Sequence, residues 1–155
     1  MTERRKQARP DVTVLKRRRL PGVSSTDVRR DAQIILKAVD EAAAELTVSL
    51  IDDAEINDLN RRYRQNDRPT DVLAFAMREG EPGPGDPAVL GDVVISLDTA
   101  ARQARSRRRT LADEVRVLLI HGILHLLGYD HERGAAQARR MQAMERRLRA
   151  RLRRR

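Results

Sequence analysis

Two hydrophobic periodicities divide the chain into short strands and amphipathic helices. Four segments either alternate apolar with small or polar residues or are rich in β-branched residues, which is typical of strands. They lie at 12–15, 46–51, 71–77 and 89–97, and the last is apolar enough to be central in a sheet. Five other segments carry apolar residues at helical spacing. Four of these helices follow predicted N-caps at Ser24 to Thr26, Asp52, Asp98 and Thr110, and the fifth begins near Arg133.

The order of these elements predicts the fold class. One strand, a helix, a strand, a helix, two strands and three helices favour an α+β fold: a single mixed β-sheet of about four strands covered by helices. A Pro/Gly-rich loop at 79–87 separates the third strand from the fourth. The chain has no internal repeat and no interdomain linker, so we expect its 155 residues to form a single domain, 1–155.

Composition narrows the class of protein. Aromatic residues make up only 2% of the chain, so the core must be aliphatic, and cysteine is absent, which excludes disulfides and thiolate metal sites. No apolar run reaches the roughly 18 residues that a membrane span needs. The basic N-terminus leads into no secretory hydrophobic region. We therefore expect a soluble cytoplasmic protein with no membrane association.

Positive charge is concentrated at the two ends of the chain. Residues 1–20 contain eight Lys or Arg against two acidic residues, and 133–155 contain ten Arg against one, whereas the part between them is mildly acidic. We define a basic N-terminal segment at about 1–10 and an Arg-rich C-terminal tail at about 146–155. Such ends either solubilise the protein or bind a polyanion, and an excess of arginine favours bidentate phosphate contacts. Arg147 and Arg151 are the candidate RNA contacts of the tail.

All three histidines of the chain lie within HGILHLLGYDH, residues 121–131. His121 and His125 are four residues apart on a predicted helix, so their rings share one face. A continued helix would carry His131 roughly 15 Å along the axis, but a left-handed C-cap at Gly128 would turn the chain back toward them. Three imidazoles and one open position are typical of a catalytic zinc site. Buried structural histidines are the alternative, and the three-residue pattern with its glycine favours a metal.

The same motif differs by one residue from the metzincin protease motif, H-E-x-x-H-x-x-G-x-x-H. Gly122 stands where those proteases have the glutamate that acts as general base. The zinc geometry is therefore shared, whereas peptidase chemistry lacks its base.

Three sequence blocks resemble the YbeY family, the bacterial metal-dependent endoribonucleases of ribosomal RNA maturation. HGILHLLGYDH is similar to the family signature, with a glycine after the first histidine. LNRRYRQNDRPTDVLAFAM at 59–77 and LGDVVIS at 90–96 are similar to two further family blocks, in the same order. The resemblance implies one zinc ion bound by His121, His125 and His131, with His121 and Arg64 in the catalytic site. The predicted architecture then includes a zinc-hydrolase-like helix that contains histidines.

The resemblance also implies a function and partners. It implies a zinc-dependent, single-strand-specific endoribonuclease that acts in 16S rRNA 3′-end maturation and ribosome quality control, with ribosomal RNA and the small ribosomal subunit and its proteins as partners. Two alternatives stay open: a metallohydrolase of peptides or small molecules, and a non-catalytic ribosome assembly factor with structural zinc. From the residues alone, Arg64 is either a cation for a scissile phosphate or an ordinary surface arginine.

Four other polar residues have roles that the sequence suggests. Asp67, Thr70 and Asp71 are expected to hold their loop through side-chain-to-backbone hydrogen bonds rather than to do chemistry. Asp92 is either an ordinary strand residue, which we favour, or a partner that orients a zinc-bound histidine.

Overall fold

The computed structural model describes residues 9–78 and 88–153. Most of the basic segment at 1–10, the whole loop at 79–87 and the last two residues of the chain lie outside these ranges. Nine elements follow one another in the predicted order. They are β1 (Asp11–Lys16), α2 (Ser25–Ala38), β2 (Glu45–Ile51), α3 (Asp53–Arg64), β3 (Val72–Ala76), β4 (Val89–Ser96), α4 (Leu97–Ser106), α5 (Leu111–Leu126) and α6 (Ala135–Arg153).

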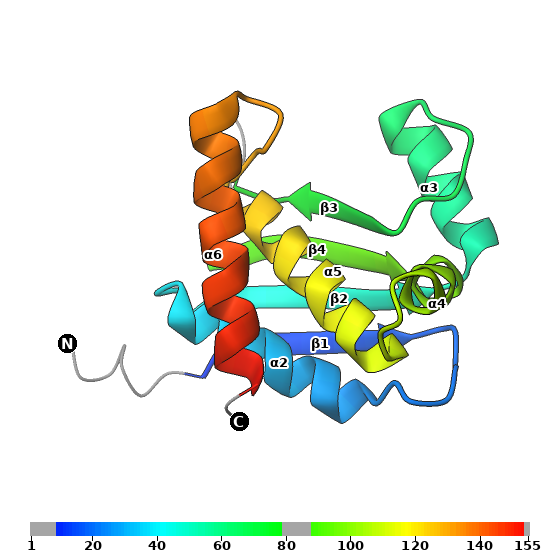
Figure 1. The fold of residues 1–155 in the computed structure, drawn as a ribbon, viewed down its shortest axis with the longest axis horizontal. Coiled ribbons are helices and arrows are strands. Elements are labelled where there is room, and N and C mark those ends of the chain that lie inside the picture. Colours follow the sequence, from blue (N-terminus) through cyan, green and yellow to red (C-terminus); the bar gives the residue numbers. More distant parts are fainter. Residues whose placement is uncertain (1–8, 79–87, 154–155) are drawn as a thin grey trace.

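The four strands form one mixed sheet in the order β1-β2-β4-β3 (Figure 1). β1 and β2 are parallel, β2 and β4 are parallel, and β3 runs antiparallel to β4. β4 is paired on both sides, as its apolar sequence predicts, and β3 is an edge strand. The α+β prediction is confirmed.

Three helices cover one face of the sheet. α2 and α5 lie across the strands, and α6 lies over these two helices (Figure 1). The core between them is aliphatic, as the composition requires, because Ile, Leu, Val and Ala from the strands and helices are buried together with Met141. α5 is the apolar centre of this layer and it carries the first two histidines.

α3 packs at one end of the opposite face. Its Ile56 is fully buried against Ile51, Leu73 and Val94 of three strands, with Leu59 at the margin. The rest of this face is open and forms a groove in which Thr47 and Asp92 take part. α3 is thereby attached to the edge of the sheet next to β3.

The N-caps follow the sequence with one exception. Ser24, Asp52 and Thr110 each accept a hydrogen bond from the backbone N–H three residues later, as predicted. The prediction that Asp98 caps α4 is wrong. The cap is Ser96, at the end of β4, whose hydroxyl accepts from the backbone N–H of Thr99.

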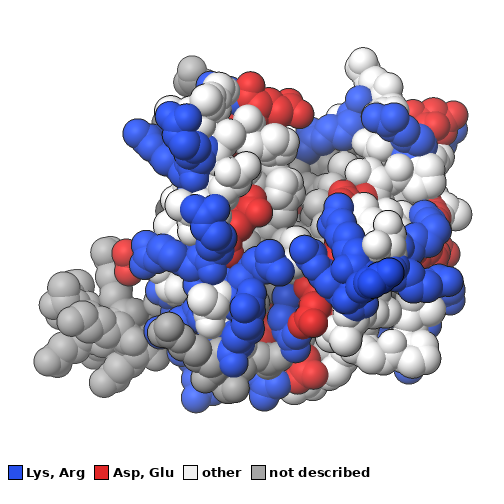
Figure 2. Space-filling model, viewed as in Figure 1, with Lys and Arg blue, Asp and Glu red and all other residues white. Residues whose placement is uncertain are grey.

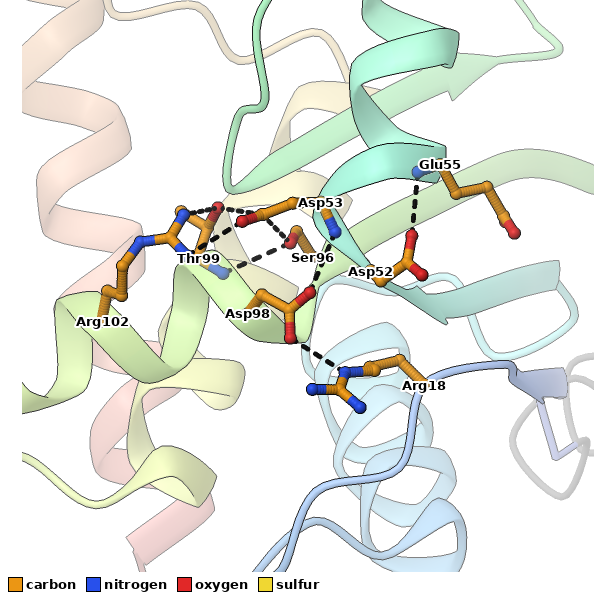
Figure 3. A network of polar contacts seen from close by, with 8 residues as sticks. All are labelled: Arg18, Asp52, Asp53, Glu55, Ser96, Asp98, Thr99 and Arg102. Atoms are coloured by element: carbon orange, nitrogen blue, oxygen red, sulfur yellow. Dashed lines mark hydrogen bonds and ion pairs between the residues drawn. The ribbon is translucent and has the colours of Figure 1, made fainter.

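Asp98 instead connects two segments that are distant in sequence (Figure 3). Its carboxylate accepts from the Arg18 guanidinium at 2.9 Å and from the backbone N–H of Asp53 at 3.1 Å. Since Asp53 is the first residue of α3, Asp98 fixes the beginning of that helix against the beginning of α4.

The Asp53 carboxylate strengthens the same junction. It accepts from the hydroxyls of Ser96 and Thr99, each at 2.7 Å, and forms an ion pair with Arg102 at 2.9 Å (Figure 3). Burial raises the pKa of Asp53, but the hydrogen bonds from Thr99, Arg102 and Ser96 outweigh it, so the net pKa lies below the usual value. α3, which ends at Arg64, is thus held by its first residue.

The last helix is present as the sequence predicts. α6 continues through Arg153, so it includes most of the Arg-rich segment at about 146–155. Leu148 and Leu152 are one turn apart and each is only 3% exposed, so they attach the segment to the core. The arginines of this segment that the structure describes are therefore held on a helix.

Within the described ranges, no helix is both long and apolar enough to cross a membrane.

Candidate functional site

The three histidines converge at the C-terminal end of α5. His121 and His125 lie on one face of the helix, and their Nε2 atoms are 3.0 Å apart. Gly128 has φ of +94°, the left-handed conformation that the sequence predicts for it. The backbone N–H of Gly128 donates to the carbonyl of His125, and that of Tyr129 donates to Leu124, both at 3.0 Å. These two bonds form a Schellman motif, which reverses the chain and returns His131 to the other two rings.

The cluster fits a single metal ion. One ring nitrogen from each histidine can be chosen so that all three lie within 4.8 Å of one another. Two ligands about 2.1 Å from a tetrahedral zinc ion are roughly 3.4 Å apart, close to the separation of the His121 and His125 nitrogens. His121 and His125 are partly buried and His131 is exposed, so the group faces solvent on one side. Three neutral imidazole ligands suit zinc and other divalent transition metals.

The surroundings of His125 lower its pKa and so favour the neutral ring that binds a metal ion. Burial lowers the pKa of His125, and the neighbouring His121 and His131 rings lower it further, against opposing effects of Asp130 and Glu132. His125 is therefore neutral at pH 7, with a lone pair free for a metal.

Glu145 of α6 lies beside His121. Its Oε1 is 3.7 Å from Nδ1 of His121, whereas the other ring nitrogen, Nε2, faces His125. A carboxylate in this position favours the tautomer with hydrogen on Nδ1 and leaves Nε2 as the metal ligand. We did not anticipate Glu145 from the sequence, because its place depends on how α6 packs against α5.

Gly122 faces the sheet between the two helical histidines. A Cβ atom at this position would lie 2.6 Å from Val93 Cγ1 and 3.3 Å from Val72 Cγ2. The helix therefore approaches β3 and β4 more closely than any side chain would permit. This explains in physical terms why the glutamate of the protease motif has no place here.

Arg64 reaches the same cleft from α3. Its Nη2 donates to the carbonyl of Ala74 on β3 at 2.7 Å, and its guanidinium carbon lies 5.0 Å from the centre of the Phe75 ring. Arg64 lines a cleft of about 500 Å³. That cleft is lined by Arg64, Asp71, Val72, Leu73, Ala74, Phe75, Ala76, His121, Gly122, His125 and Leu126.

A second hollow continues the cleft toward the third histidine. Arg64 and His125 line both, and His131 lines the second, together with Tyr129 and the turn that follows it. In the space-filling view the outline of the molecule is notched between α3 and the beginning of α6 (Figure 2). Arg64 and all three histidines therefore face connected space, although Arg64 and His121 are far apart in sequence.

Asp67, Thr70 and Asp71 hold the loop between α3 and β3, but among the described residues only one of their bonds is of the expected side-chain-to-backbone kind, and the others join two side chains. Asp67 accepts from the Asn57 side chain at 2.9 Å. Asp71 accepts from its neighbour's backbone N–H, from Thr70 and from Gln103 of α4. These bonds fix the entry into β3 and hence the carbonyl that holds Arg64.

Three other residues singled out from the sequence lie elsewhere. Asp92 neighbours Val93, and alternate residues of a strand face opposite sides of a sheet. Since Val93 faces α5, Asp92 faces the groove on the other side, where burial raises its pKa. It does not orient a histidine. Arg147 and Arg151 are exposed on α6 and line a groove beside Ala38 at the end of α2, away from the cleft.

The chain is similar to known proteins along most of its length. The family model described as Endoribonuclease YbeY matches residues 16–153. A curated protein of the same description from Syntrophotalea carbinolica is 53% identical over 123 residues, which cover 79% of this chain and 82% of that protein. Its counterpart in Aquifex aeolicus is 42% identical over 145 residues, which cover 94% and 93%.

A solved structure shares the fold. The solution structure of TM1509 from Thermotoga maritima has a TM-score of 0.64 and 26% sequence identity, and the match covers 91% of this chain and 88% of that one. The match extends over nearly all the elements described above.

Proposed function

The chain belongs to the endoribonuclease YbeY family, and from this premise we propose that it is a zinc-dependent endoribonuclease that cleaves single-stranded RNA. The observation that carries the proposal is the convergence of three histidines and one arginine on connected hollows of the surface. Three imidazoles with one open side can bind a metal ion, and a guanidinium provides the positive charge that binds a phosphate.

The biological role that we propose is maturation of the 3′ end of 16S rRNA and ribosome quality control in the cytoplasm. Its partners would be ribosomal RNA and the small ribosomal subunit with its proteins. Sequence resemblance to the family supports this role, and the strong positive charge of the chain is suited to a polyanionic substrate. We also propose that residues 1–155 form one domain of this family.

His121, His125 and His131 would hold the zinc ion through three ring nitrogens, with Glu145 orienting the first of them. A bound zinc ion supplies Lewis acidity toward a phosphate oxygen or toward water. The lowered pKa of His125 keeps protons from competing for that ligand at neutral pH.

Arg64 would bind the scissile phosphate. The Ala74 carbonyl and the Phe75 ring hold the guanidinium in one orientation, so little conformational entropy is lost when phosphate binds. Its free N–H groups can donate to the non-bridging oxygens, where negative charge increases in the transition state. A planar fork matches two of these oxygens at once.

The two alternative functions are less well supported. A peptidase of this motif needs a glutamate where Gly122 packs against Val93, and the contact leaves no room for one. A purely structural zinc site is normally closed by four protein ligands, whereas the described residues bring together a group of three. The first argument counts against a peptidase, and the second favours a catalytic metal site over a structural one.

RNA cleavage by purified variants tests the proposal. Arg64→Ala should lower the rate of cleavage of single-stranded RNA by roughly 10²–10³ with zinc content unchanged, and Arg64→Lys should recover only part of it. Arg62→Ala is the matched control, because Arg62 lies on the same helix but pairs with Asp58 at the surface. His125→Ala should lose zinc and cleavage together.

Two results would contradict the proposal. Wild-type cleavage by Arg64→Ala would remove Arg64 from the site. Full zinc occupancy in His125→Ala, measured by elemental analysis, would remove the histidine cluster as the metal site.

A further inference from the structure

A second basic hollow lies at the other end of α5, between α2, α5 and α6. Its volume is about 730 Å³, and we call it the arginine pocket. Figure 2 shows Lys and Arg side chains gathered over the C-terminal half of α6 and the adjoining part of α5. The pocket is lined by Arg30, Arg109, Asp113, Arg116, Val117, Arg149, Leu152 and Arg153.

Acidic residues neutralise the arginines that α2 and α5 bring to the pocket. Arg116 pairs with Asp31 at 3.3 Å and with Asp113 at 2.5 Å. The fully buried Glu114 pairs with Arg109 at 3.2 Å and with a neighbouring arginine outside the pocket. Arg30 is likewise paired, with an aspartate one turn before it on α2.

The two arginines from α6 are different. Among the described residues, neither Arg149 nor Arg153 has an ion pair or a side-chain hydrogen bond. They are four residues apart, so they lie on one side of the helix, and that side faces α5. Leu148 and Leu152 anchor this part of α6 in the core, which fixes the helix that carries the two arginines beside the pocket. Among the residues that the structure describes, the pocket therefore keeps two positive charges without protein partners.

We propose that the arginine pocket binds a backbone phosphate of the RNA strand, several nucleotides from the bond that is cleaved. The inference rests on the proposed function, because it takes RNA as the substrate. Guanidinium groups bind phosphate oxygens in pairs, and the hollow is wide enough to admit a phosphate with its sugar. When these arginines neutralise a phosphate, cations condensed on the RNA are released.

α5 sets the distance between the two sites. Arg116 lines the arginine pocket and His125 lines the cleft, and nine residues of helix separate them by about 14 Å. A stacked strand advances about 3.4 Å per nucleotide, so this distance corresponds to roughly four nucleotides. A strand with its scissile phosphate at Arg64 would thus reach the pocket only if it extended beyond the cleft.

The sequence pointed to Arg147 and Arg151 as RNA contacts, and they provide a matched comparison. They have the same spacing on the same helix as Arg149 and Arg153 but line a different and smaller groove, of about 410 Å³. A double Arg-to-Ala variant at either pair removes the same charge and keeps a good helix former. The two variants therefore differ in which side of α6 loses charge.

The test measures binding of fluorescent oligouridylates to the full chain at several salt concentrations, with gels to confirm that the RNA stays intact. One oligouridylate has about two nucleotides, too short to span the roughly four-nucleotide distance. The other has about twelve, within the range of known single-strand sites. Arg149→Ala/Arg153→Ala should bind the longer RNA at least roughly fivefold more weakly at low salt. Its salt slope should be less steep by about 0.7, the value for one phosphate contact on a single strand. Binding of the shorter RNA should be unchanged.

The outcomes that would overturn the inference are distinct from failure of the proposed function. Equal losses in Arg147→Ala/Arg151→Ala would show that charge alone matters and that the pocket is not a site. An unchanged affinity in Arg149→Ala/Arg153→Ala, while the parent still cleaves RNA, would overturn the pocket and leave the proposed function standing. Uridine monophosphate is the free-phosphate probe. If it bound as tightly as the longer RNA and needed Arg149 and Arg153, the pocket would be a nucleotide site instead.

Discussion

Gly122→Ala tests how closely the metal-binding helix must approach the sheet. In an isolated helix this change would gain about 1 kcal/mol, because alanine is a better helix former than glycine. In the folded protein the new Cβ would lie 2.6 Å and 3.1 Å from the two methyl carbons of Val93, and 3.3 Å from Val72 Cγ2. Local propensity and tertiary packing therefore predict opposite signs.

Packing should prevail. Carbon atoms in contact prefer about 3.5–4.0 Å, so the nearest pair must separate by roughly 1 Å. Val93 is fully buried and has no space into which to withdraw. Overpacking of this kind costs about 1–3 kcal/mol. After the gain in helix propensity, Gly122→Ala should lower the free energy of unfolding by up to about 2 kcal/mol.

Urea unfolding of the metal-free protein, with a chelator present, measures this change without a contribution from metal binding. The same substitution in a Val93→Ala background provides the control, because the two closest methyl groups are then absent. There Gly122→Ala should raise the free energy of unfolding by about 1 kcal/mol. A stabilising effect in the parent, or an equal cost in both backgrounds, would refute the packing argument.

Two further predictions concern groups that support the site. Glu145→Gln should weaken zinc affinity by roughly 10- to 100-fold without changing the free energy of unfolding of the metal-free protein, since the carboxylate orients His121. Titration with zinc measures this, and an unchanged affinity would remove Glu145 from the site. Asp53→Asn should destabilise the protein at neutral pH, because the folded-state pKa of this carboxyl is lowered. The stabilisation is present above the ordinary pKa of 3.8 and is lost as the pH falls through the folded-state pKa, so the difference between the two proteins in urea midpoint should shrink there. A difference that stays constant with pH would contradict the assigned cause.

Local periodicity accounts for the part of the fold that the sequence predicted. Strand alternation, helical spacing and N-caps are set within a few residues, which is why the element order and three of the four caps were predicted correctly. The reversal at Gly128 is equally local, because a left-handed glycine and two backbone bonds suffice. The convergence of the histidines followed from the same information.

The error in the helix caps arose where two local signals competed. Both Ser96 and Asp98 can cap a helix, and the serine does so because β4 ends at it. The segment at 146–155 has the charge of a solvated tail, yet Leu148 and Leu152 recur at helical spacing and are buried. Apolar spacing was the better guide there, since two apolar side chains on one face fix a helix whatever its other faces carry.

Glu145 and the environment of Arg64 could not be predicted from the chain alone. Glu145 approaches His121 only because α6 lies against α5 in one particular register. The Arg64 guanidinium finds the Ala74 carbonyl because the edge of β3 faces α3. Neither relation has a signature in sequence spacing, since each depends on how separate elements pack.

The edge strand β3 connects the two halves of the site. On one side, Ala74 is paired with Val93 of β4, the residue whose methyl groups contact Gly122 of the metal-binding helix. On the other side, the carbonyl of Ala74 accepts the hydrogen bond that orients Arg64. A displacement of α5 at Gly122 is therefore transmitted through one strand pair to the arginine. The glycine that excludes a protease base thus also helps to set the distance between the histidine cluster and the cation proposed to bind phosphate.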